Sequence, residues 1–138
     1  MENHNLRRYV RAMTTVIWVA MGGAIGAAGR YLVAMQALRL FGPGFPWGTL
    51  TVNVAGSLAM GLLAGLFAHR MQVSTDVRMF LMTGILGGFT TFSAFSLDVS
   101  VLVARKDYMM SAFYIIGSVS LSVAALFIGL RIARMLFA

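Results

Sequence analysis

The 138-residue sequence contains no cysteine, only two prolines and only four acidic residues. The lack of cysteine excludes disulfides and thiolate metal sites. Charged residues make up only 11% of the chain, whereas a soluble domain carries about 25%. Hydrophobic residues make up 59%. This composition excludes an ordinary soluble domain and predicts a membrane protein.

The formal net charge of +7 would suit a nucleic-acid-binding protein, but the positions of the basic residues argue against that function. Nearly all of them lie at the ends of apolar runs, as expected for membrane insertion. The chain also lacks the glycine fingerprints of nucleotide-binding loops. The short polar N-terminal tail, residues 1–11, precedes an apolar run without a signal-peptide cleavage pattern. We therefore expect a retained tail, and neither a nucleic acid nor a nucleotide as partner.

Four long runs that are nearly free of charge predict four transmembrane helices, since a helix needs about 20 apolar residues to cross a bilayer. A Gly/Pro turn at 39–48, a polar loop at 69–78 and the Arg-Lys-Asp sequence at 105–107 separate these runs. In the polar loop, Ser74 or Thr75 is expected to cap the third helix. The chain, residues 1–138, is thus predicted to form a single transmembrane domain with helices at about 12–38, 49–68, 79–104 and 108–134.

An even number of crossings places both termini and the 69–78 loop on the same side of the membrane. That side carries seven arginines against three basic residues on the other, which favours it as cytoplasmic. Most of this bias comes from the tail, and without it the count is four against three. A chain with such balanced flanks can insert in both orientations. The two groups are Arg7, Arg8, Arg11, Arg70, Arg78, Arg131 and Arg134 on the first side, and Arg39, Arg105 and Lys106 on the other.

Ionisable groups are nearly absent from the predicted helices. None contains a histidine, and the only acid at membrane depth is Asp98, near the end of the third helix. A proton-driven transporter usually needs an ionisable group near the midplane, and an enzyme needs a nucleophile–base pair or a metal cluster. We therefore do not expect an enzyme.

Neutral hydrogen-bonding side chains, in contrast, recur at helical spacing, which places them on shared helix faces. Taken singly, such residues usually serve helix packing or bond to carbonyls of their own helix. Three helices that each present a polar face without an acid favour a pathway for a solute. The polar residues and the phenylalanines among them are Thr49 and Asn53 in the second helix, Thr91, Phe92, Ser93, Phe95 and Ser96 in the third, and Ser111, Tyr114, Ser118 and Ser122 in the fourth.

The chemistry of these faces favours a small anion. Hydroxyl and amide groups can replace water around an anion, and the edges of phenyl rings carry partial positive charge. A cation pathway would instead favour carboxylates or rings of carbonyls. Arg30, within the first helix, either raises the local anion concentration or extends its charged end to the membrane interface.

Glycines at four-residue spacing predict close helix packing. The pairs are Gly22 with Gly26 in the first helix and Gly61 with Gly65 in the second. Four short helices have little interior of their own, so polar faces on three of them need a second subunit to cover them.

The segment GGFTTFSAFS, residues 87–96, closely resembles the Gly-Gly-x-Thr-Thr-Phe-Ser-x-Phe-Ser signature of the Fluc fluoride channels. The segments GGAIGAAGRY at 22–31 and WGTLTVNVAGS at 47–57 and the serines of the fourth helix support this resemblance, which covers nearly the whole chain beyond the tail. It implies an all-α, antiparallel, dual-topology homodimer in the bacterial inner membrane. The implied function is passive and selective export of fluoride through two pores per dimer.

The resemblance also implies roles for individual residues. The third helix would break at the signature, and the freed carbonyls of Gly87 and Thr90 from both subunits would hold one structural Na⁺ at the dimer centre. Irregular backbone inside a membrane needs such partners. The fluoride pathway would comprise Arg30, Thr49, Asn53, Phe92, Ser93, Phe95, Ser96, Tyr114, Ser118 and Ser122.

Two positions depart from the family pattern. Asp98 stands where the family often has Glu, and Leu126 replaces the hydroxyl expected one turn past Ser122. Two other functions stay open. A small dual-topology multidrug or cation exporter resembles this chain in outline, but that class depends on a Glu in its first membrane helix, and the only Glu here is Glu2. The other alternative is a non-conducting membrane assembly subunit.

Overall fold

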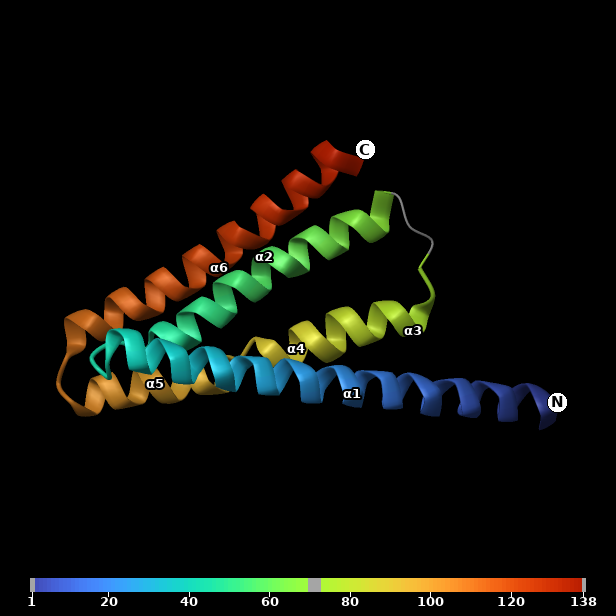
Figure 1. Ribbon diagram of the computed structural model, residues 1–138, viewed down its shortest axis with the longest axis horizontal. Helices are drawn as coiled ribbons and strands as arrows, with labels where there is room; N and C mark the ends of the chain where they lie inside the picture. The colour runs from blue at the N-terminus through green and yellow to red at the C-terminus, as the bar shows by residue number, and fades with distance from the viewer. Residues whose placement is uncertain (1, 70–72, 138) are drawn as a thin grey trace.

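The computed structural model describes residues 2–69 and 73–137, which are helical throughout apart from short turns (Figure 1). Four helical spans within these residues are long and apolar enough to cross a membrane: Tyr9–Phe41, Trp47–Ala68, Thr75–Ala104 and Tyr108–Leu136. The prediction of an all-α protein with four membrane-spanning helices is therefore confirmed. The helical elements are α1 (Glu2–Phe41), α2 (Trp47–His69), α3 (Thr75–Arg78), the π-helical segment η1 (Met79–Leu86), α4 (Gly87–Phe89), α5 (Phe92–Ala104) and α6 (Tyr108–Phe137).

Helix α1 begins at Glu2 and so includes nearly all of the polar tail. The first 21 residues contain neither glycine nor proline, so nothing in this stretch interrupts the helix. Its 40 residues correspond to a length of about 60 Å, roughly twice the thickness of a bilayer hydrocarbon core. The N-terminal end of α1 consequently projects beyond the other helices (Figure 1).

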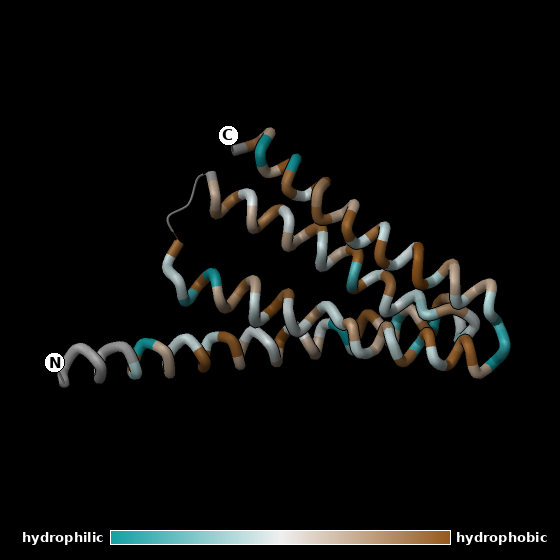
Figure 2. The backbone as a smooth tube through the Cα atoms, turned by 180° about the vertical axis from the view of Figure 1, so that it is seen from behind, coloured by the Kyte–Doolittle hydropathy of each residue, from teal (hydrophilic) through white to brown (hydrophobic). Residues whose placement is uncertain are grey.

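Helices α2 and α6 run side by side in the same direction (Figures 1 and 2). Glycines bring their backbones into contact, since a Cβ on Gly61 would collide with the carbonyl oxygen of Leu126. One turn further along α2, a Cβ on Gly65 would lie only 2.5 Å from the Cβ of Ala133. The close packing predicted from the Gly61/Gly65 spacing is thus confirmed.

Helix α1 packs in a similar way against η1. A Cβ on Gly22 would fall 2.5 Å from the carbonyl oxygen of Phe80, and one on Gly26 would collide with the backbone of Ile85. Nearer the N-terminus, the ring centroids of Trp18 and Phe80 lie 5.8 Å apart in an edge-on contact. The α2–α6 pair and the α1–η1 pair are therefore both closely packed, and the two pairs diverge toward the end that carries the C-terminus (Figure 1).

The third membrane span is interrupted near its middle. Thr90 (φ −81°, ψ 158°) and Thr91 (φ −154°, ψ 124°) are extended and separate α4 from α5. This confirms the predicted break in the third helix. At the start of the span, Ser74 caps α3 by accepting a hydrogen bond from the backbone nitrogen of Val77 at 3.4 Å, as predicted.

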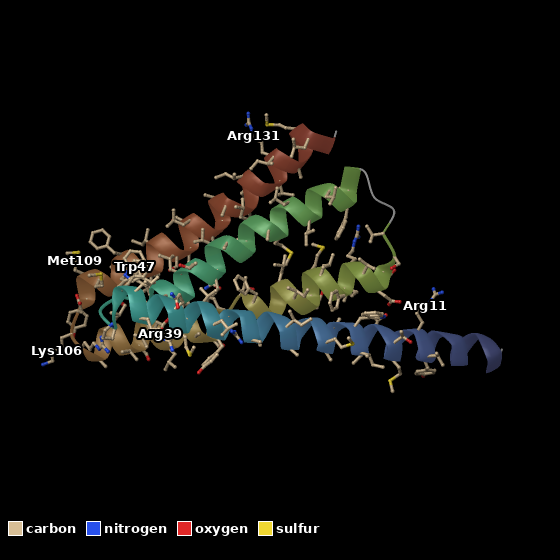
Figure 3. The ribbon with its side chains drawn as sticks, in the orientation of Figure 1. Arg11, Arg39, Trp47, Lys106, Met109 and Arg131 are labelled. Carbon is tan, nitrogen blue, oxygen red and sulfur yellow. The ribbon has the colours of Figure 1, made fainter. Side chains whose placement is uncertain are left out.

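Two turns, α1–α2 and α5–α6, meet at one end of the molecule (Figure 1). A guanidinium nitrogen of Arg105 donates to the carbonyl of Pro43 at 3.3 Å and so joins the α5–α6 turn to the α1–α2 turn. Figure 3 shows Arg39 and Lys106 at this end, with Arg11 and Arg131 toward the other.

A small core consists of Phe95, Leu102 and Tyr114. Many large apolar side chains are exposed, and apolar residues recur along all the helices (Figure 2), as expected of helices that contact lipid.

Candidate functional site

A groove with a volume of about 410 Å³ lies between α2, α6 and the break in the third span. We call it the Asn53 groove. The groove is partly open, and Phe92, which lines it, is 76% exposed. The predicted pathway residues that line it are Asn53, Phe92, Phe95, Ser118 and Ser122.

The side chain of Asn53 connects α2 to the helix break. Its Nδ2 atom donates to the Thr91 carbonyl at 2.9 Å, and the Thr91 nitrogen donates to Asn53 Oδ1 at 2.7 Å. In an uninterrupted helix, that nitrogen would donate to the carbonyl of Gly87. The Gly87 carbonyl is thereby deprived of its helical partner.

A second redirected bond affects the carbonyl of Thr90. Its helical partner would be the nitrogen of Ala94, but this nitrogen donates to Thr91 Oγ1 at 3.1 Å instead. The Thr90 side chain folds back, and its hydroxyl donates to the Leu86 carbonyl at 2.9 Å. The two carbonyls predicted to bind Na⁺ are therefore both released from the helical pattern. Backbone carbonyls are among the oxygen ligands that hard cations take, so they fit the predicted ion.

Two serines of α6 present unpartnered hydroxyls. The Oγ atoms of Ser118 and Ser122 are buried, and neither has a hydrogen-bond partner in the described part of the chain. Ser118 is only 4% exposed. Buried polar groups are normally paired, and an unpaired one costs about 1–3 kcal/mol. Both hydroxyls line the Asn53 groove and are available to a ligand there.

Aromatic rings form a continuous series beside the groove. The ring centroids of Phe92 and Phe95 are 5.4 Å apart, and those of Phe95 and Tyr114 are 5.2 Å apart. Phe95 is 8% exposed and Tyr114 is fully buried. The Tyr114 hydroxyl donates to Oδ2 of Asp98 at 3.1 Å. Tyr114 thus contacts Phe95 from the core and joins this aromatic series to the carboxylate of Asp98.

Other predicted pathway residues lie away from the groove. Arg30 and Thr49 line a separate hollow of about 310 Å³ between α1 and α2, which shares Thr91 with the Asn53 groove. The hydroxyl of Ser93 is exposed and lies 3.3 Å from that of Thr91. The hydroxyl of Ser96 is exposed and donates to the carbonyl of Phe92 at 2.9 Å.

The two departures from the family pattern occupy different places. Leu126 lines the Asn53 groove one turn past Ser122. Asp98 lines a third hollow, of about 280 Å³, near the α1–α2 turn, together with Thr49 and Arg105. The groove also includes Ser57, which is not among the predicted pathway residues. Its four-residue spacing from Asn53 is the signal that could have identified it.

Residues 17–130 match the family described as CrcB-like protein, Camphor Resistance (CrcB). The chain belongs to this family. It is 54% identical over 125 residues to the fluoride-specific ion channel FluC of Agrobacterium fabrum, a match that covers 91% of this chain and all of the relative. This chain is 50% identical over 125 residues to the fluoride-specific ion channel FluC of Allorhizobium ampelinum, with 91% of this chain and 100% of the relative covered. It is 52% identical over 124 residues to the fluoride-specific ion channel FluC of Rhizobium etli, with 90% of this chain and 99% of the relative covered.

Membership of the CrcB-like family defines the class of this protein. The relatives are named as ion channels and not as enzymes. The four apolar spans and the bacterial relatives make the chain a multi-pass bacterial membrane protein. The Asn53 groove and the helix break lie wholly within the matched residues 17–130.

Proposed function

We propose that this protein is a fluoride-selective channel that exports fluoride passively from the cytoplasm across the bacterial inner membrane. The observation that carries the proposal is the pair of buried, unpartnered hydroxyls of Ser118 and Ser122 in the Asn53 groove. The name of the relatives, fluoride-specific ion channel, supports the choice of ion.

The groove has the groups that a small anion needs. Fluoride is tightly hydrated, so a pathway must replace its water with hydrogen-bond donors. Serine hydroxyls supply such donors, and the Asn53 amide has a second N–H in addition to the one that donates to Thr91. The edges of Phe92 and Phe95 add partial positive charge. None of the described residues that line the groove is acidic, so no carboxylate repels an anion from these positions.

The proposed assembly is an antiparallel, dual-topology homodimer with two pores. The open side of the groove and the 76% exposure of Phe92 support a second copy as its cover. A twofold axis repeats each contact, so closing one groove closes its symmetry mate and yields two equivalent pathways. The sparse core of the single subunit is consistent with this requirement for a partner.

The proposal includes one structural Na⁺ at the dimer centre, held by the carbonyls of Gly87 and Thr90 from both subunits. Its support is the redirection of both helical donors to side-chain oxygens, of Asn53 and of Thr91. Gly87 is exposed on the single subunit, so its carbonyl lies on a surface that a partner can reach. Elemental analysis of desalted, purified dimer should find one sodium per dimer. A sodium content at the level of the final buffer would contradict this part of the proposal.

Fluoride efflux from liposomes tests the function directly. Purified protein is reconstituted with internal fluoride or chloride, and release is started with a potassium ionophore. We expect rapid fluoride release without chloride release. Failure of folded, dimeric protein to release fluoride would overturn the proposal. Export of drug cations that depends on a pH gradient would favour the exporter alternative, and absence of any flux would favour the assembly subunit.

A further inference from the structure

The row of hydroxyls on α6 ends before the groove does. Ser118, Ser122 and Leu126 follow one another at four-residue steps, and all three line the Asn53 groove. Past Ser122, the described α6 residues that line the groove are the aliphatic Val123 and Leu126, which offer an anion no hydrogen-bond donor. Met60 of α2 lines the same end of the groove and adds no donor.

The parallel packing of α2 and α6 defines which residues lie at the same level. Gly61 packs against the backbone of Leu126 and Leu130, and Gly129 packs against Leu58 and Leu62. Position 61 of α2 therefore lies level with about position 128 of α6. Because the two helices run in the same direction, positions four residues earlier on each helix also correspond.

This register places Ser57 level with about position 124 of α6, between Ser122 and Leu126. Asn53 lies, by the same relation, between Ser118 and Ser122. The polar groups of the two helices thus alternate along the groove. Successive polar groups along the groove therefore differ by about two residues in level, which is about 3 Å along the helix axes. This axial step is similar to the length of a hydrogen bond.

The hydroxyl of Ser57 likewise has no hydrogen-bond partner among residues 2–69 and 73–137. A serine or threonine within a helix commonly bonds to a carbonyl of the preceding turn. Thr14, Thr90 and Ser96 do so in this chain. The Ser57 hydroxyl makes no hydrogen bond to any residue in the described part of the chain, and it shares this property with Ser118 and Ser122, which line the same groove.

We infer that Ser57 is a further fluoride-binding residue, whose hydroxyl carries the ion past Ser122 at the level where α6 presents Leu126. This inference rests on the proposed function. Along the helix axes, the level of Ser57 follows that of Ser122 by about 3 Å, so the two serines offer hydroxyls at successive levels of the same groove. Met60 and Leu126, beyond them, add no hydrogen-bond donor.

Fluoride efflux from liposomes that hold the Ser57→Ala variant tests the inference. We expect at least a tenfold lower rate of fluoride release than from the wild-type protein. Ser120→Ala is the matched control, since Ser120 is an exposed serine that does not line the groove, and it should release fluoride at the wild-type rate. Adding Leu126→Thr to Ser57→Ala returns a hydroxyl to the same end of the groove and should restore most of the lost rate.

The outcomes separate this inference from the function on which it rests. If the wild-type protein does not release fluoride, the proposed function itself fails. If the wild-type protein conducts and dimeric Ser57→Ala conducts equally well, the role of Ser57 is refuted. A loss that Leu126→Thr does not restore would show that Ser57 acts only in packing, and would also overturn the inference.

A second pair of variants covers the case in which Ser57→Ala does not form a dimer. Ser57→Thr and Ser57→Val introduce side chains of nearly equal volume that differ by the hydroxyl. Higher fluoride release by the Thr variant supports the inference, and equal release by both variants contradicts it. Size-exclusion chromatography of each purified protein verifies that the compared samples are dimers.

Discussion

The side chain of Asn53 on α2 forms two hydrogen bonds with the backbone of Thr91, at 2.9 and 2.7 Å, and so occupies the gap between α4 and α5. The Asn53 amide thereby provides hydrogen-bond partners for the backbone nitrogen and carbonyl of Thr91 at the helix break. The same interaction withdraws the Thr91 nitrogen from the Gly87 carbonyl. A residue predicted as part of an ion pathway therefore also maintains the helix break.

Two substitutions of Asn53 should separate these roles. Asn53→Ala leaves the nitrogen and the carbonyl of Thr91 unpaired, at a cost of about 1–3 kcal/mol for each group, and should lower the thermal stability of the detergent-solubilised protein. Asn53→Asp retains the acceptor for the Thr91 nitrogen but adds negative charge to the groove. It should lower fluoride efflux at least tenfold with a smaller loss of stability. Wild-type efflux from Asn53→Asp at neutral pH would show that Asn53 serves the helix break alone.

The unpartnered serines provide a test in which stability and function diverge. Ser118→Ala and Ser122→Ala remove hydroxyls that form no hydrogen bond in the described part of the chain, so the melting temperature should stay the same or rise. Fluoride efflux should nevertheless fall. Ser96→Ala is the control, because its exposed hydroxyl bonds only to its own helix. Unchanged efflux in the Ser118/Ser122 double variant would remove the main support for the proposed pathway.

The two phenylalanines should respond differently to replacement by isoleucine. Phe92→Ile alters a ring that is 76% exposed on the subunit, so efflux should fall with little change in melting temperature. Phe95→Ile also removes the contact with Tyr114, and aromatic pairs contribute about 0.5–1.5 kcal/mol. It should therefore lose both efflux and stability. Normal efflux in both variants would argue that aliphatic volume suffices at these positions.

Helix packing in the subunit can be tested with a matched glycine pair. Gly61→Ala places a Cβ against the carbonyl oxygen of Leu126 and forces α2 and α6 apart; such overpacking costs about 1–3 kcal/mol. A Cβ on Gly117, in α6, meets no atom within 4 Å, so Gly117→Ala should not lower the stability of the protein and should raise it slightly, since alanine favours a helix over glycine. Thermal unfolding in detergent measures both. Equal melting temperatures would show that α2 and α6 tolerate a larger separation.

The four spans could be predicted from sequence because long uncharged runs have few alternatives to a membrane helix. The position of the break was available only through the resemblance of residues 87–96 to a known signature. The cap at Ser74 followed from local chemistry, since its side chain satisfies a backbone nitrogen of the next turn. Each of these features depends on neighbouring residues in the chain.

Other features depend on contacts between distant segments and were not predicted. The pairing of Asn53 with Thr91 spans 38 positions, and helical periodicity alone cannot specify it. The separation of Arg30 and Thr49 from the Asn53 groove follows from the packing of α1 on α2. The extension of α1 was missed for a different, local reason. The polar composition of residues 1–11 suggested a tail apart from the first membrane helix, whereas α1 is continuous from Glu2.

Helix α1 is about twice as long as the bilayer core is thick, and its N-terminal part carries Arg7, Arg8 and Arg11. In the proposed antiparallel dimer, one such rod would stand on each face of the membrane. The basic N-terminal part of one α1 would then lie on the cytoplasmic side of the membrane, and that of the other α1 would lie on the opposite side. A reagent that binds residues 2–11 would label sealed vesicles to the same extent from outside, whichever way the dimer had entered the bilayer.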